Sequence, residues 1–229
     1  MIFITGDTHG DFNRVTKFCF EQNTSTKDTL IILGDSGINY YKDSRAVALK
    51  RRLSMLPITI FSIYGNHEER PENIPSYKTK WYKGGIVYYE EEYPNLLFAK
   101  DGEIFDLDGK KTIVIGGAYS IDKIYRLRMG YNWYPDEQPS DTIKEYVETQ
   151  LANNNWTVDV VLSYTAPLKY EPTEFFMQGI DQSKVDKSTE RWLNMIEGRL
   201  KYKRWYFGHY HHYKKIDKMT MLFKEIDIF

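Results

Sequence analysis

The chain of 229 residues carries 31 Lys and Arg against 32 Asp and Glu, with a formal net charge of -1. This balance provides no polycation for non-specific binding to nucleic acid, and a single cysteine excludes an internal disulfide and a cysteine-rich zinc site. Apolar runs are far shorter than the ~20 residues of a membrane-spanning helix, and the N-terminus has no signal-peptide pattern. We therefore expect a soluble, cytoplasmic protein without a membrane partner, folded as a single domain over residues 1–229.

In the first third of the chain, three apolar segments predict strands that each end at a polar loop containing glycine. They span residues 2–5, 29–33 and 58–63. Apolar residues at helical spacing predict a helix that begins after Asp11, whose carboxylate would cap it, and a second helix over residues 44–55 that ends before Pro57.

After residue 86 the pattern changes to a succession of short strands. We expect strands over residues 86–89, 96–99, 103–107 and 112–115, with Asp108-Gly109 as a hairpin turn. Helices are expected around residues 143–151 and 192–200, and strands over 158–162, 204–207, 214–216, 219–223 and 225–228. This order predicts an α/β fold, a four-layer α/β/β/α sandwich of two mixed sheets flanked by helices.

Polar clusters follow four of the predicted strands. They are Asp7-Thr8-His9, Gly34-Asp35, Gly65-Asn66-His67-Glu68 and Gly208-His209-Tyr210-His211. Because ligands bind at the carboxyl ends of strands in layered α/β folds, these loops can converge on one site. Carboxylates, imidazoles and an amide without thiolates suit Mn, Fe or Zn.

The order of these clusters resembles the motifs of the calcineurin-like metallophosphoesterase superfamily, and in particular those of its branch of Ser/Thr protein phosphatases. The resemblance covers residues 5 to about 211 and implies two divalent metal ions, with Mn expected first. The ligands that it implies are Asp7, His9 and His211 for the first ion, Asp35 as a bridge, and Asn66 and His209 for the second. A hydroxide between the ions would attack a phosphomonoester or phosphodiester.

The resemblance also implies roles for residues that do not bind the ions. His67 matches the histidine that stabilises the transition state or protonates the leaving group. Asp11 and Glu68 could orient imidazole N–H groups. His212 should face away from its neighbour His211, so we expect it to be structural.

One position departs from the family. The superfamily places a further metal-binding histidine before a segment that reads Tyr164-Thr165-Ala166-Pro167 in this chain, where the histidine is replaced by Tyr164. Three outcomes are open: a weakly occupied second site and low activity, an inactive protein that binds a phosphorylated ligand or a partner, or direct ligation by Tyr164. The phosphoesterase is our first hypothesis and the inactive binding protein is the alternative.

The substrate is a phosphorylated molecule of unassigned type, because the arginine that binds phosphate in the protein phosphatases has no counterpart after Asp35. Arg126 is a candidate replacement, although it could equally form a surface ion pair with Asp122 or Glu137. The loop that contains it, residues 125–139, could border the substrate site. A basic run at residues 201–204 is a weak argument for nucleic-acid binding, and no oligomeric state is assigned.

Overall fold

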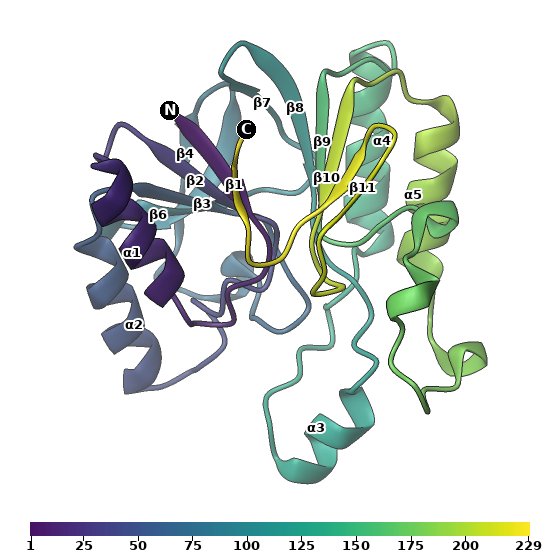
Figure 1. Ribbon diagram of the computed structural model, residues 1–229, viewed down its shortest axis with the longest axis horizontal. Coiled ribbons are helices and arrows are strands. Elements are labelled where there is room, and N and C mark those ends of the chain that lie inside the picture. The colour runs from purple at the N-terminus through teal and green to yellow at the C-terminus, as the bar shows by residue number, and fades with distance from the viewer.

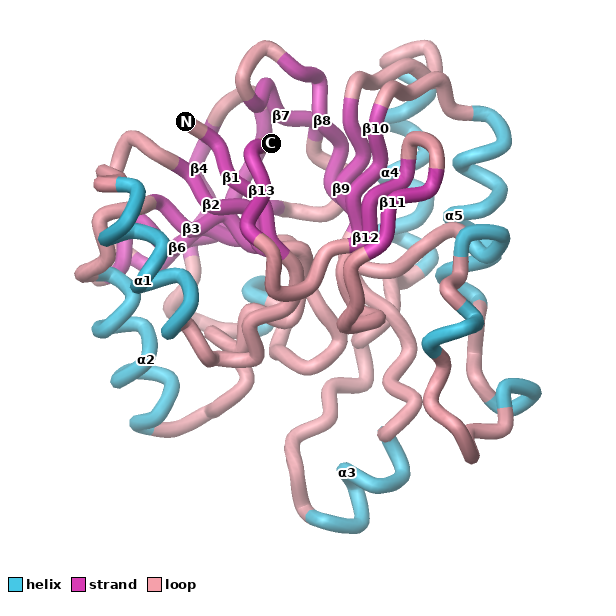
Figure 2. The backbone as a smooth tube through the Cα atoms, viewed as in Figure 1, coloured by secondary structure: helices cyan, strands magenta, loops and turns pink.

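The computed structural model describes residues 1–229 and contains two mixed β-sheets (Figures 1 and 2). The seven-stranded sheet has the order β13 (Ile226–Ile228), β1 (Ile2–Thr5), β2 (Thr29–Ile32), β3 (Thr59–Ser62), β6 (Tyr93–Ala99), β5 (Gly85–Glu90) and β4 (Lys78–Tyr82). The six-stranded sheet has the order β11 (Lys214–Ile216), β12 (Met219–Met221), β10 (Arg204–Phe207), β9 (Val160–Ser163), β8 (Lys110–Ile115) and β7 (Ile104–Leu107).

Helices cover the outer face of each sheet. Two of them, α1 (Asn13–Gln22) and α2 (Ser44–Ser54), flank the first sheet, and α4 (Asp141–Asn153) and α5 (Ser188–Arg199) flank the second (Figure 1). A short helix, α3 (Lys123–Met129), projects beyond the sheets. The predicted α/β/β/α sandwich is confirmed.

Three buried apolar clusters hold these layers together, and β2 shows how the sequence builds them. Ile31 packs in the cluster between the sheets, whereas Leu30 and Ile32 pack beneath the helices. Side chains alternate along a strand, so a strand that is covered on both faces needs a continuous apolar run rather than an alternating one. A third cluster lies between the second sheet and its helices.

Most predicted elements are present, and the predicted hairpin turn is confirmed between β7 and β8, where Asp108 and Gly109 have φ of 57° and 71°. Among the α-helices and strands, two were not predicted. Strand β4 is a polar, mainly exposed edge strand, and α3 has no buried residue. Strand β4 buries no residue, and the apolar side chains of α3, such as Ile124 and Leu127, are exposed, so neither element has a buried apolar face.

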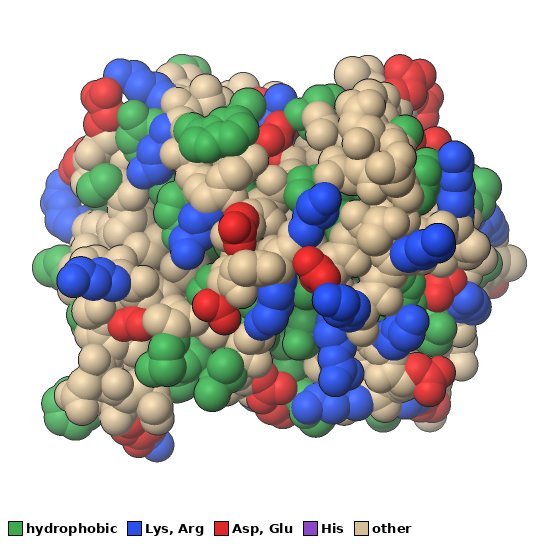
Figure 3. All heavy atoms as spheres, turned by 90° about the horizontal axis from the view of Figure 1, so that it is seen from above, with side chains coloured by type: hydrophobic (Ala, Val, Ile, Leu, Met, Phe, Trp, Pro, Cys, Tyr) green, Lys and Arg blue, Asp and Glu red, His purple; other side chains and the backbone are tan.

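The parallel strands bring the polar loops to one edge. Strands β1, β2 and β3 are parallel to one another, as are β8, β9 and β10, and their carboxyl ends lie on the lower side of Figure 1. The opposite face carries interspersed positive and negative side chains (Figure 3). The basic run at residues 201–204 lies at the opposite end of β10 from the loops, and its Lys203 pairs with Asp159 at 2.7 Å. No helix has the length and apolar character needed to cross a membrane.

Candidate metal centre

Four of the predicted site residues have left-handed backbone conformations in the loops that follow the strands. The φ angles are 47° at His9, 42° at Asp35, 68° at His209 and 56° at His211. Such conformations are costly for residues other than glycine and cluster at functional sites, where they aim side chains in a fixed direction. The backbone is therefore shaped to direct these side chains to one place.

Glycine is required where these loops touch each other. A Cβ on Gly65, the residue before Asn66, would lie 2.0 Å from Asp35 Oδ1. A Cβ on Gly34 would lie 2.1 Å from Cδ2 of the Tyr164 ring. The loops after β2, β3 and β9 thus approach one another too closely for side chains at these two positions.

The first predicted ion position is formed by Asp7, His9 and His211. Asp7 is fully buried, and its Oδ2 lies 3.7 Å from His9 Nε2 and 3.4 Å from His211 Nε2, while the two imidazole nitrogens are 2.9 Å apart. Ligand atoms about 2.1 Å from one ion are roughly 2.8 to 3.7 Å apart for angles between about 85° and 125°. The three ligand atoms therefore fit a single divalent ion.

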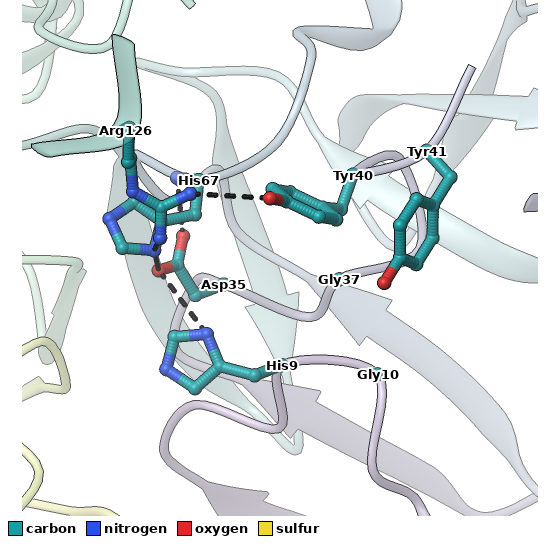
Figure 4. Close-up of a pocket in the computed structure, with 8 residues that line it drawn as sticks. All are labelled: His9, Gly10, Asp35, Gly37, Tyr40, Tyr41, His67 and Arg126. Atoms are coloured by element: carbon teal, nitrogen blue, oxygen red, sulfur yellow. Dashed lines mark hydrogen bonds and ion pairs between the residues drawn. The ribbon is translucent and has the colours of Figure 1, made fainter. Parts of the chain in front are cut away.

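Asp35 lies beside this group and has a free oxygen. Its Oδ1 accepts a hydrogen bond of 2.8 Å from the His67 backbone N–H. Its Oδ2 is buried without a hydrogen-bond partner, 3.7 Å from His9 Nδ1 and 3.4 Å from His67 Nδ1 (Figure 4). A buried carboxylate oxygen without a donor is unfavourable unless a cation compensates it, so Asp35 also fits a metal ligand.

The residues predicted for the second ion are arranged differently. The buried Tyr164 hydroxyl lies 3.1 Å from Asp7 Oδ2 and 3.0 Å from Asn66 Oδ1, and these two oxygens share its single proton. Asn66 donates to Ser120 at 2.8 Å, and the backbone N–H of His209 donates to Asp7 Oδ1 at 2.9 Å. The Tyr164 hydroxyl thus bonds Asn66 Oδ1, the oxygen that a second ion would need. In this arrangement Asn66 and His209 do not fit a second metal ion.

Burial and neighbouring charged groups shift the pKa values of the residues in this centre. Burial, together with the charges of Asp35 and Asp7, holds the pKa of Tyr164 well above 10, so its hydroxyl stays a donor. Burial lowers the pKa of His209 to about 4 and also lowers that of His9. Burial opposes the charge on Asp7, yet its histidine neighbours hold the pKa of this carboxyl below its ordinary value. The lowered pKa values of His9, His209 and Asp7 favour the neutral imidazoles and charged carboxylate that metal ligation requires, whereas the hydrogen bond with Asp7 raises the pKa of His211.

His67 and Arg126 line a small cavity of about 180 Å³ beside Asp35 (Figure 4). Arg126 donates to Asp122 Oδ2 at 2.8 Å, as one sequence alternative expected, and its Nη2 lies 2.6 Å from His67 Nδ1. Asp122 Oδ1 lies 3.4 Å from His67 Nε2. Burial and Arg126 lower the pKa of His67, but the carboxylates of Asp35 and Asp122 outweigh them and raise it.

The expectation that Glu68 and Asp11 orient imidazole N–H groups is wrong for both residues. Glu68 accepts hydrogen bonds from the backbone N–H and hydroxyl of Ser36, at 3.1 and 2.7 Å, so it braces the loop after Asp35 instead of orienting an imidazole. Asp11 is exposed and accepts from the Asn13 N–H at the start of α1. The turn after residue 67 points Glu68 toward the neighbouring loop, which spacing alone could not reveal.

Three other side chains complete this description. His212 stacks on Phe175 with ring centroids 4.0 Å apart, away from the Asp7 group. Ser120 and Asp122, which contact Asn66 and His67, were missed as site residues. Both belong to the segment after β8, which carries no histidine, and Asp122 was expected only as an ion-pair partner of Arg126.

The fold and this group of side chains define a metal-binding α/β protein of the phosphoesterase type. The family model of the calcineurin-like phosphoesterases matches residues 1–213, and the chain belongs to this family. A search of curated proteins gave no match.

Solved structures show similarity in fold. The crystal structure of TT1561 of Thermus thermophilus is 13% identical, with a TM-score of 0.49, and the alignment covers 97% of this chain and 87% of that one. Another crystal structure is 14% identical with a TM-score of 0.52, covering 96% and 88%. At this level of identity, the second similarity supports the sandwich fold and carries no information on substrate.

Proposed function

We propose that residues 1–229 form a single metallophosphoesterase domain that hydrolyses a phosphomonoester or a phosphodiester. The observation that carries this proposal is the convergence of Asp7, His9 and His211 beside the unpaired oxygen of Asp35. A divalent ion bound there, with Mn proposed first and Fe or Zn as alternatives, supplies an activated water and neutralises phosphate charge.

His67 is the proposed catalytic acid. Its Nδ1 lies 2.6 Å from Arg126 Nη2, and its Nε2 faces Asp122. The carboxylates of Asp35 and Asp122 favour the imidazolium, whose Nε2 proton can pass to a leaving-group oxygen that enters the cavity beside Asp35, leaving a neutral imidazole. Arg126 therefore positions the imidazole, and its guanidinium on the cavity wall is the proposed contact for substrate phosphate.

Tyr164 is the reason to expect slow turnover. Its hydroxyl donates to Asn66 Oδ1, the oxygen that the proposed second ion would need, and also to Asp7 Oδ2. We propose that the second ion binds weakly, if at all, and that Tyr164→His raises both its occupancy and the rate of hydrolysis.

The test is hydrolysis of p-nitrophenyl phosphate and bis-p-nitrophenyl phosphate with Mn. We expect slow turnover of at least one substrate that Asp7→Asn abolishes and His67→Ala lowers. If neither substrate is hydrolysed, by this chain or by Tyr164→His, the enzymatic proposal fails.

A second function is favoured by the same tyrosine. A protein whose second ion position is filled by a phenol could bind a phosphorylated ligand without hydrolysing it. Retained binding of inorganic phosphate together with absent hydrolysis would support this reading. The cytoplasm remains the proposed location, in keeping with the free thiol of the single cysteine, Cys19.

A further inference from the structure

A larger cavity, of about 550 Å³, opens from the metal centre between the segment around α3 and the loop that joins β9 to α5. Both segments descend below the strand ends in Figure 1. Asn66, His67 and His209 line its inner part. Its outer walls are apolar and include Ile121, Tyr125, Phe176, Met177, Ile180 and Val185. This volume is typical of a pocket for a small organic ligand.

Glu190 lies in this apolar pocket with an unused oxygen. The residue is only 4% exposed and belongs to the first turn of α5. Its Oε1 accepts a hydrogen bond of 2.9 Å from the Thr165 hydroxyl, whereas its Oε2 is buried without any partner. Buried carboxylate oxygens are normally paired, so the unpaired Oε2 points to a donor that comes from outside the chain.

No side chain around the pocket supplies that donor. The neighbouring acid Glu171 is already paired with Lys187 at 2.8 Å. A glutamate in the third position of a helix often accepts from the backbone N–H of the capping residue, but Glu190 makes no such bond to Lys187. The pocket therefore holds one uncompensated carboxylate outside the metal centre. Burial keeps the pKa of Glu190 high, at about 7, which a cationic partner would lower.

We propose that this pocket binds the organic group of the substrate, and that Glu190 binds a protonated amine on it. The preferred substrate class is then a phosphoester whose leaving group is an apolar ring that carries an amine. This inference rests on the proposed function for the reaction, but binding to the pocket can be measured without turnover.

The first test is binding of 4-(aminomethyl)phenol, p-cresol and ethanolamine to the unmodified protein by calorimetry. We expect the aminomethyl compound to bind at least about tenfold more tightly than p-cresol, because a charge-assisted hydrogen bond replaces an unpaired oxygen. It should also bind more tightly than ethanolamine, which lacks the ring. Equal affinities for the aminomethyl compound and p-cresol would overturn the role of Glu190, and equal affinities for it and ethanolamine would overturn the role of the apolar walls.

The second test uses variants and turnover. Glu190→Gln should bring the ratio of kcat/KM for 4-(aminomethyl)phenyl phosphate over 4-methylphenyl phosphate close to one. Glu103→Gln is the control, because Glu103 is also buried but is paired with Tyr146 and the Ile86 N–H and does not line the pocket. A ratio that Glu190→Gln leaves unchanged would overturn the proposal. Absent hydrolysis with a retained difference in binding would refute the phosphoesterase function but support the pocket.

Discussion

Replacing Tyr164 with phenylalanine tests the contribution of the hydroxyl group that bonds Asn66 Oδ1, the oxygen that the proposed second ion would need. The ring stays in place, so the change removes only the hydrogen bonds to Asp7 Oδ2 and Asn66 Oδ1. A hydrogen bond to a charged group contributes about 1.5 to 3 kcal/mol, and Asp7 keeps its bond from the His209 N–H. We therefore expect Tyr164→Phe to lower the free energy of unfolding of the metal-free protein by about 2 kcal/mol.

The assay is urea and thermal unfolding in EDTA, where a loss of about 2 kcal/mol in a chain of this length lowers Tm by roughly 4 to 8 °C. Tyr202→Phe is the matched control, because its hydroxyl donates to Glu197 at 2.8 Å but Glu197 keeps its ion pair with Lys169. The control should lose less than about 1 kcal/mol. A Tyr164→Phe protein as stable as the unmodified chain would refute the argument that the hydroxyl satisfies Asp7.

Three further predictions concern other parts of the molecule. Arg70→Met should cost about 3 to 5 kcal/mol in urea unfolding, because the buried Asp101, now 2.8 Å from the guanidinium, loses its only ion pair and keeps just the hydrogen bond from the Gly116 N–H; wild-type stability would contradict this. Burial raises the pKa of Glu190 from 4.5 to about 7, so the folded state holds a proton that the unfolded chain releases, and stability falls as pH rises through this range. Glu190→Gln should remove up to about 3 kcal/mol of that fall between pH 4.5 and pH 8, measured by urea unfolding; an unchanged slope would count against it. His67→Gln should lower kcat on p-nitrophenyl phosphate on the order of 100-fold with Mn affinity unchanged, whereas lost Mn binding would make His67 a ligand instead.

The layers of the fold were predictable because the buried strands carry unmistakable apolar runs. A segment such as Leu30–Leu33 has to be covered on both faces, and like β1 and β10 it ends at a glycine that begins a polar loop. Helix α3 and strand β4 were not predictable in this way. Neither buries an apolar face, so their conformation is set by their surroundings rather than by a pattern in their own residues.

Some residues of the candidate site could likewise be predicted from the sequence, and others could not. Asp7, His9, Asp35 and His211 could be grouped from the sequence, because each follows a strand whose carboxyl end lies at the same edge. The partners of His67 could not, since Asp122 reaches it from a projecting loop that only the tertiary structure places. The substitution by Tyr164 was visible in the sequence, but the acceptors of its hydroxyl were not.

The number of Mn ions bound per chain, measured at equilibrium for the unmodified protein and for Tyr164→His, tests the account most directly. Ligand atoms converge at Asp7, His9 and His211, those of His9, Asp35 and His67 lie beside them, and the Tyr164 hydroxyl bonds Asn66 Oδ1, the oxygen that the proposed second ion would need. We predict one tightly bound Mn in the unmodified chain and two in Tyr164→His. Two tightly bound ions in the unmodified chain, or none in either protein, would contradict the account.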